Sequence, residues 1–154
     1  MAAQGTESPS DGVVVRTGRE RYRTEVEARG HRLVADEPLA LGGTDQGPTP
    51  FEYVAAALGA CTSITLRMYA DRKEMALEEV IVRVRHEKTN EPGKGRVDRL
   101  YREIELVGAL SDAERARLLE IADRCPVHRA IEAGIEIVTT AAPLAAVAGA
   151  RAAS

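Results

Sequence analysis

The stretch PFEYVAAALGACTSITLRMYADRK, residues 50–73, decides the fold because it has the composition of one long apolar helix. Pro50 suits the first turn of a helix, where its missing N–H would have had no partner, and Thr49 before it is a favourable N-cap. Apolar and small residues recur here at spacings of three and four, which places them on one side of a helix. The pattern therefore predicts a helix from about Pro50 to Lys73, with a stripe formed by Val54, Leu58, Cys61, Thr65 and Met68.

Strands are predicted on both sides of this helix. After it, apolar and charged residues alternate, so that Val80, Val82 and Val84 share one face of a half-exposed strand. Before it, Gly30 lies between two strand-like runs and supplies the turn of a hairpin. The predicted strands are residues 12–18, 21–30, 31–38, 77–88 and 99–108, with a turn over 89–98 between the last two.

Two shorter helices and a closing strand complete the predicted fold. Ser111 and Glu114 have the spacing of a capping box at the start of the first helix. The second helix has Pro126 in its first turn and Gly134 just past its end. Residues 135–140, IEIVTT, are then expected to form a strand. The order is three strands, a long helix, two strands, two helices and one strand, which predicts an α+β fold.

The length of 154 residues fits one domain, which we place at residues 12–140. Residues 1–11 are rich in small and polar residues together with Gly, Pro and Ser, so they are expected to be disordered. Residues 141–154 are rich in Ala and are expected to form a flexible tail.

Composition excludes several function classes. The net charge is −3 without a basic block, which argues against a nucleic-acid partner, and a chain with one Phe and no Trp offers no stacking platform for bases. No apolar run is long enough for a bilayer, and the first residues lack the pattern of a signal peptide. Two cysteines without export signals fit a reducing compartment. We therefore expect a cytoplasmic protein without a membrane or nucleic-acid partner.

The two cysteines are the main candidates for chemistry. Cys125 precedes Pro126 at a helix N-terminus, where free N–H groups and neighbouring Arg side chains favour a thiolate; a small capping residue is the alternative. Cys61 lies mid-helix on the apolar stripe, where burial alone would raise its pKa, so its own segment indicates an inert core thiol. The three His and two Cys show no metal-ligand spacing, and we expect no metal and no bound cofactor.

The segments GGTDQGPTPFEYVAAALGACTS (42–63) and DRCPVHRAIEAGIEIVT (123–139), with the strand pair between them, resemble the OsmC/Ohr family of osmotically inducible and organic hydroperoxide resistance proteins. The resemblance covers residues 14–140 and indicates a branch distinct from the best-studied hydroperoxide reductases. It implies an OsmC-like fold in an intertwined homodimer, with strands of both chains in shared sheets. The long helices would lie near the centre, with two active sites at the interface.

The resemblance also implies a thiol peroxidase. Cys61 matches the cysteine that attacks the peroxide, and Cys125 matches the resolving cysteine that closes a disulfide with it. The substrates would be organic hydroperoxides and hydrogen peroxide. An external dithiol reductant, in the family a lipoyl-bearing protein, would reopen the disulfide. The resemblance thus makes Cys61 the attacking thiol, whereas the local sequence indicates that Cys125 is the more acidic one.

In the hydroperoxide reductases, a Glu after the helix-starting Pro pairs with an Arg that activates the first cysteine. Here Glu52 comes one residue later, about half a turn around the helix from Cys61, so it is a candidate for that role or for a first-turn acid. Arg16, Arg19 and Arg29 are candidates for the Arg, with Arg19 preferred.

His128 stands where better-known branches carry Ser, and it is a candidate proton shuttle or a capping residue. The altered Glu and Arg leave a second hypothesis open. In it, the protein keeps the fold and binds a small hydrophobic or thiol-bearing ligand at the dimer interface, with weak or no peroxidase activity.

Overall fold

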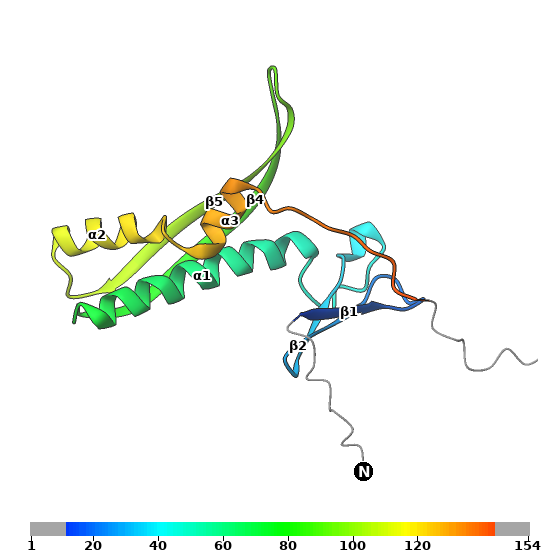
Figure 1. Ribbon diagram of the computed structural model, residues 1–154, viewed down its shortest axis with the longest axis horizontal. Helices are drawn as coiled ribbons and strands as arrows, with labels where there is room; N and C mark the ends of the chain where they lie inside the picture. Colours follow the sequence, from blue (N-terminus) through cyan, green and yellow to red (C-terminus); the bar gives the residue numbers. More distant parts are fainter. Residues whose placement is uncertain (1–11, 144–154) are drawn as a thin grey trace, which may run out of the picture.

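The structure is a computed structural model that describes residues 12–143. The predictions for residues 1–11 and for most of the Ala-rich tail lie outside the described residues. The elements confirm a mixed α+β fold (Figure 1). They are β1 (Val13–Thr17), β2 (Thr24–Ala28), β3 (His31–Ala35), the 3-10 turn η1 (Leu39–Leu41), α1 (Pro50–Arg72), β4 (Leu77–Glu91), β5 (Gly95–Gly108), α2 (Asp112–Ala122) and α3 (Pro126–Ala133).

The N-terminal sheet is antiparallel, with strand order β1-β2-β3, and lies beyond the first turn of α1 (Figure 1). The predicted turn at Gly30 is confirmed. Arg29 and Gly30 both have positive φ, 49° and 83°, and Ala28 pairs with His31 across them. This is the geometry of a two-residue hairpin turn whose twist matches that of the strands.

The second sheet is the long β4–β5 hairpin, whose far end projects from the body of the molecule (Figure 1). The predicted turn between these strands is confirmed, but it is shorter than residues 89–98, because the ladder continues to the pair Glu91 and Gly95. Gly93 and Gly95 have positive φ, so the chain reverses within a few residues and needs no longer loop.

The core lies where α1 meets α2 and the β4–β5 hairpin. Leu66, Ala70 and Leu118 are 0% exposed there. Leu77, Ile121 and Ala122 complete the same cluster. This half of the molecule therefore closes its core within one chain.

The stripe predicted for α1 is wrong in register. The buried residues of the helix are Ala55, Leu58, Thr62, Leu66 and Ala70, whereas Val54 and Met68 are 40% and 66% exposed. Apolar and small residues occur on every side of this helix, so spacing alone does not select the face. The packing of α2 and β4 against α1 decides it.

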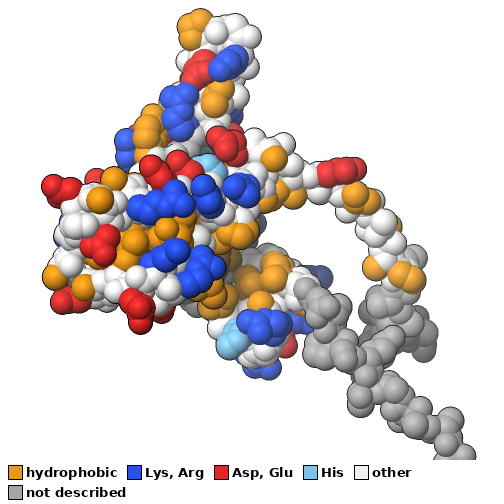
Figure 2. Space-filling model, turned by 60° about the vertical axis from the view of Figure 1, so that its left-hand side comes forward, with side chains coloured by type: hydrophobic (Ala, Val, Ile, Leu, Met, Phe, Trp, Pro, Cys, Tyr) orange, Lys and Arg blue, Asp and Glu red, His pale blue; other side chains and the backbone are white. Residues whose placement is uncertain are grey.

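The predicted closing strand is also wrong within this chain. Residues 135–140 are extended but belong to no strand, and Ile135, Ile137 and Val138 are 65%, 85% and 80% exposed. Figure 2 shows an arm that stands apart from the body, with apolar side chains along it. Alternation makes a segment suitable for a sheet, but a strand also needs a partner, and residues 135–140 pair with none of the described strands.

A buried carboxylate anchors the loop that leads into α1. Asp36 is 2% exposed and accepts hydrogen bonds from the Thr44 hydroxyl and from the backbone N–H groups of Tyr22, Glu37, Thr44 and Gln46. The hydrogen bond from the Thr44 hydroxyl holds the pKa of Asp36 well below its usual range, and the backbone donors act in the same direction. The loop is thereby tied to the N-terminal sheet.

Within residues 12–143, no helix combines the length and the apolar character that crossing a membrane requires.

Candidate active site

The start of α1 sets the position of the first cysteine. The predicted N-cap is confirmed, because the Thr49 hydroxyl accepts the N–H of Glu52 at 3.3 Å. The Glu52 carboxylate accepts the N–H of Thr49 at 2.8 Å in return, which completes a capping box. The structure thus gives Glu52 a local helix-capping role, and its carry-over as a catalytic acid stays a prediction.

The second cysteine lies between α2 and α3. Cys125 is the N-cap of α3, its N–H donates to the carbonyl of Ala122 at 3.3 Å, and its own carbonyl accepts the N–H of Arg129 at 3.1 Å. The side chain is 0% exposed. The free N–H groups of the first turn of α3 therefore face a thiol that solvent does not reach.

The two thiols meet where α3 crosses α1. Both are free cysteines, and they are close enough for each thiol to shift the pKa of the other. Cys61 is partly exposed, whereas Cys125 is buried. The fold thus brings together two thiols that are far apart in the sequence, and it leaves one of them open to solvent.

Their environments differ in what they do to ionisation. Burial raises the pKa of the Cys61 thiol, and the adjacent Cys125 adds to that rise. Burial also opposes ionisation of Cys125, but hydrogen bonds from Cys61 and from the N–H groups of Val127 and His128 lower the pKa of its thiol below the ordinary value. Within this chain Cys125 is the more acidic thiol, as its place at a helix N-terminus predicts.

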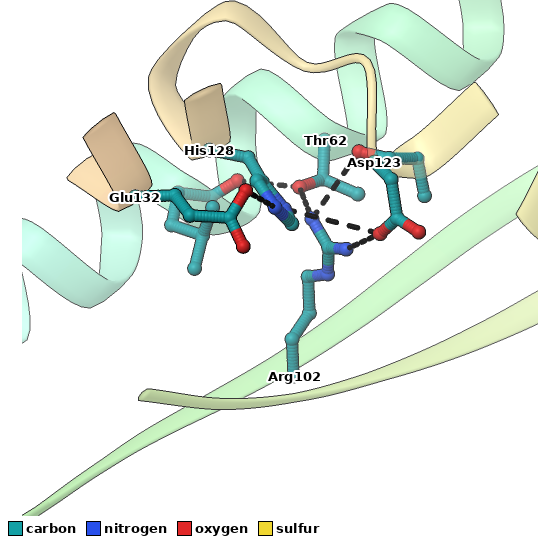
Figure 3. Close-up of polar contacts among 7 residues, drawn as sticks. Thr62, Arg102, Asp123, His128 and Glu132 are labelled. Carbon is teal, nitrogen blue, oxygen red and sulfur yellow. Dashed lines mark hydrogen bonds and ion pairs between the residues drawn. The ribbon is translucent and has the colours of Figure 1, made fainter. Parts of the chain in front are cut away.

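A residue that the sequence analysis missed, Arg102, reaches the same site from β5 (Figure 3). Its guanidinium donates to the Thr62 hydroxyl at 3.1 Å and to the carbonyl of Ala122 at 3.3 Å, and it pairs with Asp123 at 2.8 Å. The Arg102 side chain is only 13% exposed. A signal for it was present, because strand alternation places Arg102 on the same apolar face as Leu100, Ile104 and Leu106.

His128 lies between two acids on the other side of this site (Figure 3). Its Nδ1 is 3.9 Å from Asp123 Oδ1, and its Nε2 is 3.3 Å from Glu132 Oε2. The ring can therefore pass a proton among carboxylates or hold α3 in place. Its role as a shuttle stays a prediction.

The three arginines considered as activators lie in the N-terminal sheet. Arg16 faces Glu27 at 4.0 Å, Arg19 is exposed in the bend after β1, and Arg29 is exposed in the hairpin turn. Among the described residues, no hydrogen bond or ion pair joins any of them to a cysteine. Their assignment stays a prediction.

A pocket of about 410 Å³ opens between α1, β5 and α3, and neither cysteine is among its lining residues. It combines apolar walls with two arginines, one histidine and two acids, and in the described part of the chain no three His, Cys, Asp or Glu side chains are placed to hold a metal. The lining residues are Leu58, Asp98, Arg99, Leu100, Arg102, His128, Ile131 and Glu132.

Comparison with protein families gives one decisive match: the family model described as OsmC-like protein matches residues 43–140. The chain belongs to the OsmC-like protein family. The resemblance of the two cysteine segments to this family is thus confirmed. A search of curated proteins finds no match.

Solved structures confirm the OsmC-like fold. An OsmC-like protein from Mycoplasma pneumoniae is 17% identical with a TM-score of 0.68, over 82% of this chain and 89% of that one. An organic hydroperoxide resistance protein OsmC from Legionella pneumophila is 23% identical with a TM-score of 0.59, over 80% and 91%. A protein assigned to organic hydroperoxide resistance from Vibrio cholerae, with captopril bound in one of its active sites, is 20% identical with a TM-score of 0.57, over 82% and 88%.

Proposed function

We propose that this OsmC-like protein reduces organic hydroperoxides, and also hydrogen peroxide, with Cys61 and Cys125. The observation that carries the proposal is that the fold places one partly exposed thiol and one buried thiol close enough to shift each other's pKa. Membership of the OsmC-like family supports it, as do structural relatives that are organic hydroperoxide resistance proteins.

The difference in solvent access supports the roles proposed for the two sulfurs. A peroxide can approach Cys61 but not the fully buried Cys125. The pKa of Cys125 is lowered, and in its thiolate form this neighbouring sulfur can accept the proton of Cys61 as Cys61 attacks. The attacking sulfur is then a thiolate, which is the nucleophilic form.

The first step breaks the O–O bond. The Cys61 sulfur bonds to the distal oxygen, which keeps its hydrogen, so that Cys61 becomes a sulfenic acid. The electron pair of the O–O bond leaves with the other oxygen as an alkoxide, which takes a proton from solvent and departs as the alcohol. The sulfur is oxidised by two electrons, and the peroxide is reduced by two.

The second step closes a disulfide. Cys125 loses its proton and its thiolate attacks the sulfur of the sulfenic acid; the hydroxide that leaves takes up that proton and forms water. An external dithiol, for which a lipoyl group is the expected type, then opens the disulfide by exchange and is itself oxidised to a disulfide. No resident cofactor is required in this scheme.

We further propose that the working form is a homodimer. The inner face of the N-terminal sheet lines an open apolar hollow of about 850 Å³. The exposed 135–140 segment, which alternates like a strand and has no partner among the described residues, suits pairing with a second copy. Two free thiols suit a reducing cytoplasm.

The experiment adds cumene hydroperoxide to freshly reduced protein with a dithiol reductant and follows the loss of peroxide. We expect wild type to turn over repeatedly and Cys61→Ser to consume none. Cys125→Ser should consume one equivalent of peroxide and stop at a sulfenic acid, detected by mass. Equal consumption by wild type and Cys61→Ser would reject the proposal.

A second candidate function is the binding of a thiol-bearing ligand at the same site. The Vibrio cholerae relative holds captopril, a small thiol, in one of its active sites, and the pocket between α1, β5 and α3 offers both apolar and cationic walls. If the protein consumes no peroxide, captopril is titrated into it and the heat of binding is measured by calorimetry. Saturable binding that Cys61→Ser abolishes would favour it, and no heat of binding would reject it.

A further inference from the structure

The guanidinium of Arg102 ties three elements of the fold together (Figure 3). From β5 it donates to the carbonyl of Ala122, the last residue of α2, at 3.3 Å, and to the carboxylate of Asp123 at 2.8 Å. It also donates to Thr62 Oγ1 on α1 at 3.1 Å. One side chain therefore fixes the end of α2 against α1.

The acceptors of this guanidinium have the free capacity that it needs. The Thr62 hydroxyl donates its one proton to the carbonyl of Leu58 at 2.7 Å, so its oxygen remains an acceptor for Arg102. The carbonyl of Ala122 accepts the N–H of Cys125 at 3.3 Å and keeps a second lone pair for Arg102. A cation at the C-terminal end of a helix also faces the favourable end of the helix dipole.

These contacts join the surroundings of the two thiols. Thr62 directly follows Cys61 on α1, and Asp123 lies two residues before Cys125 in the short connection between α2 and α3. Because one residue separates Asp123 from Cys125, a contact that fixes Asp123 also restricts where the Cys125 sulfur can lie. Arg102 therefore holds the segment that carries the second thiol against the helix that carries the first.

Burial strengthens this tether, and the shape of the guanidinium makes it rigid. The side chain of Arg102 is 13% exposed, and Thr62 is 0% exposed. Hydrogen bonds that water does not reach are stronger than those at the surface. A planar guanidinium presents several N–H donors in fixed directions, so it can meet three acceptors at once in one geometry, which a flexible ammonium does not.

We propose that Arg102 is a positioning residue that holds the turn before Cys125 in place for disulfide closure with Cys61. This rests on the proposed function, in which the Cys125 thiolate attacks the sulfenic sulfur and the S–S bond forms as the S–O bond breaks. The departing hydroxide takes up the proton that Cys125 gave up and forms water. Closure competes with a second peroxide, which oxidises the sulfenic acid to a sulfinic acid, so a thiol held near its target protects the first one.

The test measures disulfide closure with no peroxide present. The protein is equilibrated with mixtures of reduced and oxidised glutathione, and the fraction with a Cys61–Cys125 disulfide is read by mass after alkylation of free thiols. Two protein thiols give up two electrons and two protons, and one glutathione disulfide becomes two glutathione thiols, so the equilibrium constant reports how well the fold presents the pair. We expect Arg102→Met to lower this constant by about tenfold.

Matched variants separate positioning from general loss of stability. Thr62→Val is close to isosteric and removes one of the three acceptors, so it should lower the constant by about threefold, whereas Thr62→Ser keeps the acceptor and should restore it. Arg83→Met makes the same chemical change at an exposed arginine on β4 that pairs with Glu103 and Glu105, and should leave the constant unchanged. Urea denaturation of the reduced proteins measures stability separately.

Arg102→Met decides the test if it folds, and Thr62→Val decides it otherwise. A constant equal to or larger than that of wild type in the deciding variant would overturn the proposal, even where stability falls, and so would an equal loss in Arg83→Met. The expected changes in a protein that consumes no peroxide would reject the peroxidase function and leave the positioning role standing.

Discussion

The two halves of this molecule treat their apolar side chains differently. Where α1 meets α2 and the β4–β5 hairpin, Leu66 and Leu118 are 0% exposed. In the N-terminal sheet, Val13, Val15 and Leu33 are 62%, 57% and 47% exposed. One half has a core that is buried within a single chain, although Ile64 and Met68 on the outer side of α1 are 55% and 66% exposed. The other half presents an apolar face that monomeric proteins rarely leave open. The cysteine pair lies in the half with the buried core.

The largest expected effect is on the complete core. Leu66→Ala should lower the free energy of unfolding by about 3 kcal/mol, because it leaves a cavity in a fully packed site. Urea denaturation followed by circular dichroism measures it. Leu39→Ala, at a position 72% exposed, should change the value by less than about 0.5 kcal/mol. Similar losses at both positions would show that the two environments are energetically alike.

Whether a second copy covers the open face of the N-terminal sheet can be tested by measuring the oligomeric state of the protein. Val15→Lys places a charge on the hollow of the N-terminal sheet, so if a second copy covers that hollow, dimer dissociation should rise by about tenfold or more. Sedimentation velocity over a concentration series measures it. Val14→Lys changes the next residue, which points to the opposite face of β1, and should leave the mass unchanged. Equal behaviour of both variants would locate the interface elsewhere.

The helices α1 and α2 both begin with a capping box, so the same local motif can be tested at two places in the molecule. Thr49→Ala at α1 and Ser111→Ala at α2 should each cost about 1 kcal/mol, because each removes the same acceptor for a backbone N–H. Urea denaturation of both measures it. A much larger loss at Thr49 would show that the start of α1 depends on contacts beyond its cap.

Glu52 can be examined for a second role with a substitution that spares the cap. Gln supports a capping box as Glu does, so Glu52→Gln should keep stability within about 0.5 kcal/mol of wild type. Glu52→Ala, which removes the acceptor, is the control for the cap itself. Stability by urea denaturation and peroxide consumption are measured together, and a fall in consumption by well-folded Glu52→Gln would assign the acid a chemical role.

The smallest effect is a change in acid sensitivity. The folded pKa of Asp36 is lowered from a value of 3.8, so its contribution to stability is fully present above about pH 4 and is lost as pH falls through the lower folded pKa. Thermal melts between neutral and strongly acidic pH should show a shallower acid loss in Asp36→Asn than in wild type. Identical slopes would mean that the loop does not depend on the charge.

Much of the fold could be predicted because its signals are local. The helix over residues 50–72, its N-cap at Thr49, the hairpin turn at Gly30 and the capping box at Ser111 all depend on hydrogen bonds within a few residues. The acidity of Cys125 has the same origin, since the N–H groups that lower its pKa belong to the next residues of the chain.

The predictions that were wrong concern features set by residues that are far away in the sequence. The buried face of α1 and the absence of a strand at 135–140 are set by which surfaces the rest of the chain offers, and an alternating or periodic pattern carries no information about them. Arg102 was visible only as a charge on an apolar strand face, with nothing to identify its targets.

By itself the sequence determined where the helices begin and end, the turn at Gly30, and the family to which the two cysteine segments belong. Only the tertiary structure brought Cys61 near Cys125 and placed the guanidinium of Arg102 against the Thr62 hydroxyl. The reason is physical: caps and turns are settled by neighbours along the chain, whereas the environment of a buried sulfur is settled by whichever helices and strands pack against it.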